Sequence, residues 1–247
     1  MFIRGSRYVR TGKLPDVRRV RSTLPKQRNL QEITKGFKFQ SQPDDCWAVC
    51  IYNILHELSE RSGLDALKIS ESRLNRAMGY GRGMGALAIR IDGVAPNLNR
   101  LLLPHGYRMQ ERSEIGLVGI AEILADESAS FPVAGVSSAY LRAKKNTARL
   151  KIEGEPSEGV DHTVVVLGAD AREIVAFDPL EKFSRGGRGG DGLITLGTPT
   201  FLEYWGRASV ARQWVMYATS IPKRDERSTL KHPRWSVIER DQSGDDK

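Results

Sequence analysis

Residues 46–60 constrain the fold more than any other part of the chain, because this segment is apolar around most of its circumference when wound as a helix. A helix of that kind must be covered on nearly all sides, so the segment predicts a long helix buried in the core. Pro43, Asp44 and Asp45 precede it and predict a helix start at Cys46. A chain of 247 residues is long enough to bury such a helix without disulfides.

The remaining pattern divides the chain into a helix-rich half and a strand-rich half. Helices are predicted at residues 70–78, 92–104, 116–127 and 199–205, and strands at 107–110, 131–138, 160–168, 173–177 and 213–219. This order predicts an α+β fold in which an N-terminal helical half packs on a C-terminal antiparallel sheet.

Cys46 is the candidate nucleophile. A thiol of ordinary pKa is only a few per cent thiolate near neutrality, and it becomes a strong nucleophile beside an imidazole or at a helix N-terminus. The predicted helix start gives Cys46 the second of these environments. Gln40 lies six residues upstream on an extended stretch. Its side-chain amide and the backbone N–H of Cys46 are the expected donors to an oxyanion.

His162 and Asp178 are the candidate base and orienting carboxylate. Residues 169–172 join the two predicted strands in a hairpin, which puts His162 and Asp178 at the same end of adjacent antiparallel strands. His162 can then take the thiol proton while Asp178 fixes the imidazole tautomer. Asp161 is the competing carboxylate, but successive strand side chains point to opposite faces, which favours Asp178.

The arrangement of these residues resembles the papain-like fold and, within it, the peptidases that trim double-glycine leaders from bacteriocin precursors. Gln40, Asp45, Cys46 and Cys50 match the Gln-x5-Cys-x3-Cys pattern of that family, and His162 in an apolar strand with the Asp178-Pro179 pair matches its second half. Cys46-Trp47-Ala48 is also similar to the corresponding run of papain. The resemblance covers residues 37–220 and implies a papain-like cysteine peptidase with the cleft between the two halves.

Two other interpretations apply to the cysteine pair. A cysteine at a helix start is often a small buried hydrophobe, and Cys50, one turn after Cys46, could form a metal or redox pair with it. No second ligand cluster lies nearby, so Cys50 is interpreted as a packed core residue. The sequence predicts no cofactor, no metal site and no disulfide.

The positive charge of the chain lies in its first 36 residues. They contain ten Lys and Arg against Asp16 and Glu32, a net charge of +8 that equals the formal net charge of the whole chain. The division predicted is therefore a basic arm at 1–36, a peptidase domain at 37–221 and a polar tail at 222–247. The arm can bind a polyanion such as nucleic acid or an acidic protein, serve as a solvated extension, or lie across the cleft as a pro-segment.

The expected function is hydrolysis of peptide bonds by a Cys46-His162-Asp178 triad with Gln40 as oxyanion donor. The same residues could carry out acyl transfer, deamidation or isopeptide cleavage. A different class of function is a catalytically silent binding module tethered by its arm to nucleic acid or an acidic partner. Trp47 beside the nucleophile, together with the resemblance, favours glycine on the acyl side of the cleaved bond. With no predicted membrane span and no signal peptide, the expected location is cytoplasmic.

Overall fold

A six-stranded antiparallel sheet forms the centre of the molecule. The computed structural model describes residues 27–40, 46–62, 69–78, 94–137, 162–180, 191–208 and 213–221. The sheet order is β1-β6-β2-β3-β4-β5, and every neighbouring pair of strands is antiparallel. The strands are β1 (Tyr107–Arg112), β2 (Val133–Val136), β3 (His162–Ala169), β4 (Glu173–Phe177), β5 (Leu193–Gly197) and β6 (Val215–Ser220).

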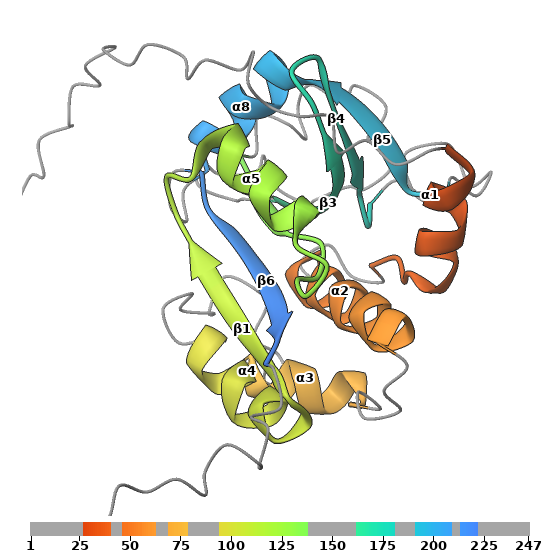
Figure 1. The fold of residues 1–247 in the computed structure, drawn as a ribbon, viewed down its shortest axis with the longest axis vertical. Helices are drawn as coiled ribbons and strands as arrows, with labels where there is room; N and C mark the ends of the chain where they lie inside the picture. The colour runs from red at the N-terminus through yellow and green to blue at the C-terminus, as the bar shows by residue number, and fades with distance from the viewer. Residues whose placement is uncertain are drawn as a thin grey trace, which may run out of the picture.

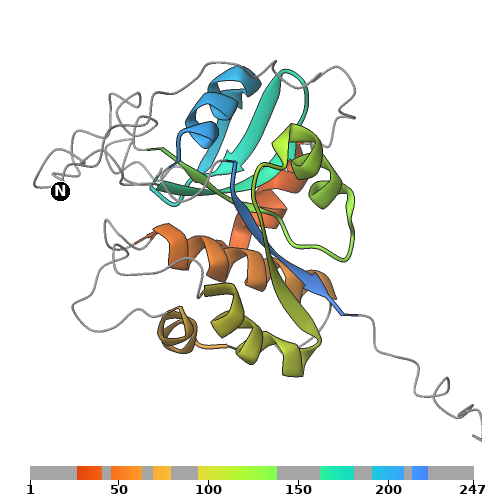
Figure 2. The same cartoon turned by 90° about the vertical axis from the view of Figure 1, so that its left-hand side faces the viewer.

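Helices cover both faces of this sheet. They are α1 (Gln27–Ile33), α2 (Cys46–Ser62), α3 (Glu71–Ala77), α4 (Val94–Leu102), α5 (Gly116–Ala125) and α8 (Thr198–Gly206), with 3-10 turns η2 (Thr34–Gly36) and η6 (Leu103–His105). Figure 1 shows α2, α3 and α4 beside one another, and Figure 2 shows them on the opposite side of the sheet from α5 and α8. The α+β fold predicted from the sequence is therefore confirmed.

The buried helix α2 packs mainly against β3 and forms the centre of the larger core. Its residues Ile51 and Ile54 are fully buried, as an all-round apolar sequence requires. Trp47 lies near its N-terminal end, and the Trp47 ring contacts that of Trp214 with 4.7 Å between centroids and an interplanar angle of 32°. This aromatic pair fixes the first turn of α2 against the residue that precedes β6.

The second core lies on the other face of the sheet, beneath α5 and α8. Phe201 and Trp205 of α8 are fully buried there, with ring centroids 5.5 Å apart. The indole N–H of Trp205 donates to the backbone carbonyl of Trp214 at 2.7 Å. Four strands contribute side chains to both cores, namely β2, β3, β4 and β6. These strands are therefore apolar on both faces, and their sequences are continuous hydrophobic runs.

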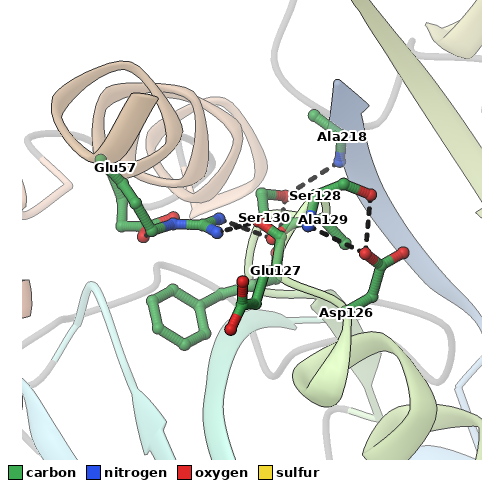
Figure 3. Close-up of polar contacts among 9 residues, drawn as sticks. Glu57, Asp126, Glu127, Ser128, Ala129, Ser130 and Ala218 are labelled. Atoms are coloured by element: carbon green, nitrogen blue, oxygen red, sulfur yellow. Dashed lines mark hydrogen bonds and ion pairs between the residues drawn. The ribbon is translucent and has the colours of Figure 1, made fainter. Parts of the chain in front are cut away.

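Arg61 ties the C-terminal end of α2 to the turn before β2. Its Nη2 donates to the carbonyl of Ala129 at 2.6 Å, and its Nε donates to Oε1 of Glu57, one turn earlier, at 2.8 Å. In the same turn, the N–H of Ser130 donates to the carbonyl of Ala218 in β6 at 2.7 Å, and the N–H of Ala218 donates to Ser130 Oγ at 2.9 Å (Figure 3). The helix is thus fixed to the sheet at both ends.

The structure confirms the predicted helices and strands and adds three features. The last ten residues of the predicted basic arm form α1 and η2, and Leu30 is buried in the core. The strand β5 was not predicted. The predicted strand at 213–219 corresponds to β6 and lies between β1 and β2 inside the sheet.

Several predictions fall on residues outside the described ranges. They concern the helix start signal at 43–45, the competing carboxylate Asp161, residues 1–26 of the arm and the tail at 222–247. Among the described residues, no helix combines the length and the apolar character needed to cross a membrane.

Candidate active site

The thiol of Cys46 lies at the N-terminus of α2, where the helix dipole favours a negative charge. The residue is 7% exposed. Burial by itself would raise the pKa of Cys46, but a hydrogen bond and the charge of His162, with a further hydrogen bond from the backbone of Thr163, lower the pKa below the ordinary value of 9.0. The thiolate is therefore stabilised by its partners in spite of its burial.

His162 is the first residue of β3 and faces Asp178 across the hairpin. Its Nε2 lies 2.8 Å from Oδ1 of Asp178, and both side chains are almost completely buried. Burial would lower the pKa of His162, but the charge of Asp178, its hydrogen bond and the hydrogen bond with Cys46 raise that pKa to about 10. The ring is an imidazolium at neutral pH, and with Nε2 engaged by Asp178, Nδ1 is the nitrogen left for Cys46.

Asp178 follows the last residue of β4 and is held by the backbone around it. Its N–H donates to the carbonyl of Gly192 at 2.8 Å, and its Oδ1 accepts a hydrogen bond from the N–H of Leu180 at 2.8 Å. The carboxylate is fully buried. A buried carboxylate requires a charged or hydrogen-bonding partner, and Asp178 has both.

Gln40 reaches the same end of the sheet on an extended segment, residues 37–40. Its backbone N–H donates to the carbonyl of Pro179 at 3.2 Å, and the residue is 2% exposed. This bond joins the segment that carries Gln40 to the residue directly after Asp178. The structure therefore links Cys46 with His162 and His162 with Asp178, and it joins the backbone of Gln40 to Pro179; the role of the Gln40 side chain stays a prediction.

Cys50 is a packed core residue, as the sequence indicated. It is fully buried, and its thiol donates to the carbonyl of Thr163 at 3.5 Å. Burial, followed by the negative charge of Cys46, raises the pKa of Cys50 well above 9.0. Two thiols one helical turn apart thus have pKa values shifted in opposite directions, and that of Cys46 is the one lowered. Both cysteines of the chain are free.

Trp47, which follows Cys46 directly, packs into the core. Its ring is buried against that of Trp214. The preference for glycine on the acyl side stays a prediction.

Two residues near the site were not predicted from the sequence. The backbone of Thr163 helps to lower the pKa of the Cys46 thiol, and Asn53 of α2 binds the backbone of Lys38, two residues before Gln40. Asn53 had a detectable signal, because it is a polar residue on the apolar helix face that also carries Cys46 and Cys50.

The described residues contain no group of three or more His, Cys, Asp or Glu side chains placed to hold a metal ion. A thiolate paired with an imidazolium supplies a nucleophile together with a proton donor, which suits attack on a carbonyl followed by protonation of a leaving group. No protein-family model matches the chain, and no curated protein matches it.

Proposed function

We propose that this protein is a cysteine peptidase of papain-like fold that hydrolyses peptide bonds with Cys46 as nucleophile. The observation that carries the proposal is the buried series Cys46, His162 and Asp178, in which the pKa of the thiol is lowered and that of the imidazole is raised. Such opposite shifts in neighbouring groups are typical of catalytic pairs. A purely structural cysteine is better represented by Cys50, whose pKa is raised.

The papain-like assignment is supported by where the elements place these residues. The nucleophile begins a long helix that packs on an antiparallel sheet, the base begins β3, and the carboxylate follows β4. The chain order Cys, His, Asp agrees with the resemblance noted in the sequence. The cleft proposed for the substrate lies at the end of the sheet where these three residues meet.

In the proposed reaction, the Cys46 thiolate attacks the carbonyl carbon of the peptide bond, and the π electrons of the carbonyl move to its oxygen. The backbone N–H of Cys46 and the side-chain amide of Gln40 donate to this oxyanion. As the tetrahedral intermediate collapses, the C–N bond breaks and His162 gives its proton to the leaving amine. A thioester on Cys46 remains.

Hydrolysis then regenerates the thiolate. The neutral His162 takes a proton from water, the resulting hydroxide attacks the thioester carbon, and the C–S bond breaks to release the carboxylic acid. Asp178 stays ionised throughout and keeps Nε2 of His162 engaged, so Nδ1 faces the thiol and the leaving group.

A mixed peptide library analysed by mass spectrometry tests the proposal. The unmodified protein is expected to cleave a subset of the peptides. Cys46→Ala is expected to cleave them at least about 10³-fold more slowly. Cys50→Ala serves as the matched control. Cys50→Ala removes a thiol one turn away and is expected to retain most of the activity, because the Cys50 thiol is fully buried and its pKa is raised. Cleavage that persists in Cys46→Ala would overturn the proposal.

A peptide vinyl sulfone gives an independent measurement. Its β-carbon forms a bond with the reactive thiolate, and a proton from His162 is added to the α-carbon, so no other reactant is needed. Modification is expected at Cys46 and not at Cys50. Labelling confined to Cys50 would contradict the assignment of the nucleophile.

A further inference from the structure

Asn53 connects the helix of the nucleophile to the segment that carries Gln40. It lies in α2 seven residues after Cys46, two helical turns along the same face, and is fully buried. Its Oδ1 accepts a hydrogen bond from the N–H of Lys38 at 2.8 Å, and its Nδ2 donates to the carbonyl of Lys38 at 3.0 Å. One side chain thus satisfies both backbone groups of Lys38.

The rest of the 37–40 segment is fixed to β4. The rings of Phe37 and Phe39 each lie with centroids 5.2 Å from that of Phe177, and the N–H of Gln40 donates to the carbonyl of Pro179. The segment is therefore held between α2 on one side and the end of β4 on the other. Asn53 supplies two hydrogen bonds that attach the segment to α2, and the Lys38 ammonium also lies 4.0 Å from the centroid of the Tyr52 ring in that helix.

We propose that Asn53 is a positioning residue for the oxyanion donor, which sets the place of the Gln40 side-chain amide relative to the thiol of Cys46. This inference rests on the proposed function. A donor stabilises an oxyanion only within a narrow range of distance and angle, and a misplacement of about 1 Å can cost about 10²-fold in rate. Because Cys46 and Asn53 belong to one rigid helix, the nucleophile and the attachment of its donor keep a constant spacing.

Asn99 offers a matched control within the same chain. Its Oδ1 accepts from the N–H of Met109 at 2.6 Å, and its Nδ2 donates to the carbonyl of Met109 at 3.1 Å. This is the same pair of bonds between a helix and an extended segment, but it joins α4 to β1 at the edge of the sheet, three strands away from β3. Asn99→Ala therefore reports the structural cost of losing such a pair without disturbing the 37–40 segment.

The experiment compares Gln40→Ala, Asn53→Ala, Asn99→Ala and the double variant Gln40→Ala/Asn53→Ala, each assayed where it is fully folded. For a library peptide cleaved by Cys46, Asn53→Ala is expected to lower kcat by about 10- to 100-fold with a small change in KM. Asn99→Ala is expected to leave kcat within about twofold. The double variant is expected to be no slower than Gln40→Ala alone, because a misplaced donor has no effect once the donor is gone.

Alkylation by iodoacetamide separates positioning from damage to the nucleophile. The thiolate displaces iodide from an sp³ carbon, so the reaction needs no oxyanion donor, and its rate at Cys46 and its pH dependence are expected to be unchanged in Asn53→Ala. If that variant does not fold, Asn53→Asp keeps the shape of the side chain and the acceptor for Lys38 N–H. The same loss in kcat with unchanged alkylation is expected of it.

Two results would overturn the inference while leaving the proposed function intact. One is an Asn53→Ala variant whose kcat matches that of Asn99→Ala. The other is a double variant whose loss is the product of the two single losses. Failure of the proposed function has a different outcome, namely hydrolysis that does not depend on Cys46.

Discussion

The Nε2 of His162 and the Oδ1 of Asp178 lie 2.8 Å apart in a part of the core where neither side chain is exposed by more than about 2%. Burial penalises both charges, yet the pKa of His162 is raised to about 10, because the Asp178 charge and the hydrogen bonds around the ring outweigh the desolvation. The imidazolium therefore persists well above neutral pH. Its partner on the other side of the ring is Cys46, whose pKa is lowered.

Asp178→Asn is expected to move the alkaline limb of the pH profile of kcat/KM to lower pH. With Asp178 in place, activity is expected to fall as pH rises through about 10, where His162 gives up its proton. The variant removes the charge that raises the pKa of His162, while the burial that lowers it remains. The rate at neutral pH is expected to fall by about 10²-fold. An alkaline limb at the same pH in the variant would refute the role of Asp178.

His162→Ala is expected to reverse the direction of the pKa shift of Cys46. Burial raises the pKa of this thiol, and the hydrogen bond and charge of His162 are the main influences that lower it. Without His162, burial dominates and the pKa moves above 9.0. The pH dependence of Cys46 alkylation by iodoacetamide measures this change. A midpoint that stays below 9.0 in the variant would show that the helix dipole and Thr163 suffice.

Gly192→Ala is expected to destabilise the protein more than Gly116→Ala. Both glycines have a left-handed backbone, with φ of +75° and +62°, so a side chain at either costs about 1–2 kcal/mol. A Cβ at Gly116 has no atom within 4 Å, whereas at Gly192 it would overlap the ring of Phe177, directly before Asp178. We expect the free energy of unfolding, measured in urea, to fall by at least about 1 kcal/mol more in Gly192→Ala than in Gly116→Ala. A lower kcat is expected in Gly192→Ala alone. Equal effects would mean that the ring moves aside without cost.

Trp214→Ala is expected to lower the free energy of unfolding by about 3–5 kcal/mol, because a fully buried ring is removed from the face of Trp47. Trp214→Phe keeps an aromatic ring but loses the hydrogen bond from the indole N–H to Oε1 of Glu111 at 2.6 Å. Its expected cost is about 1–3 kcal/mol. Guanidinium unfolding of both variants gives the comparison. A cost under about 1 kcal/mol for Trp214→Ala would show that the pair does not hold α2 in place.

The places of the candidate residues on their helix and strands were predictable from the sequence because they depend on local patterns. The all-round apolar character of 46–60 placed Cys46 at the start of a buried helix, and the hairpin at 169–172 brought His162 and Asp178 to the same end of two strands. Each of these inferences needs only a short stretch of chain. That Cys46 and His162 should lie next to each other was expected from the resemblance to papain-like peptidases.

The parts that were missed depend on partners distant in the sequence. Leu30 lies among basic residues, so α1 resembled the rest of the arm until its contact with the core was known. In β5 only Ile194 is buried, which leaves almost no alternation to detect. The role of Asn53 depends on its hydrogen bonds with the backbone of Lys38, which lies fifteen residues earlier. No periodicity in the sequence predicts that pair.

The place of β6 between β1 and β2 determines when this site can be assembled on a ribosome. Strand β1 pairs with β6 along its whole length, and Gln110 and Thr219, bonded across that pair, are 109 residues apart in the chain. The partner of Trp47, Trp214, is made just before β6. Helix α2 therefore leaves the exit tunnel long before the surface that covers it, and contacts so distant in sequence form late in folding. A nascent chain that already contains Cys46 has to wait for translation to pass residue 220 before the helix that carries Cys46 is covered.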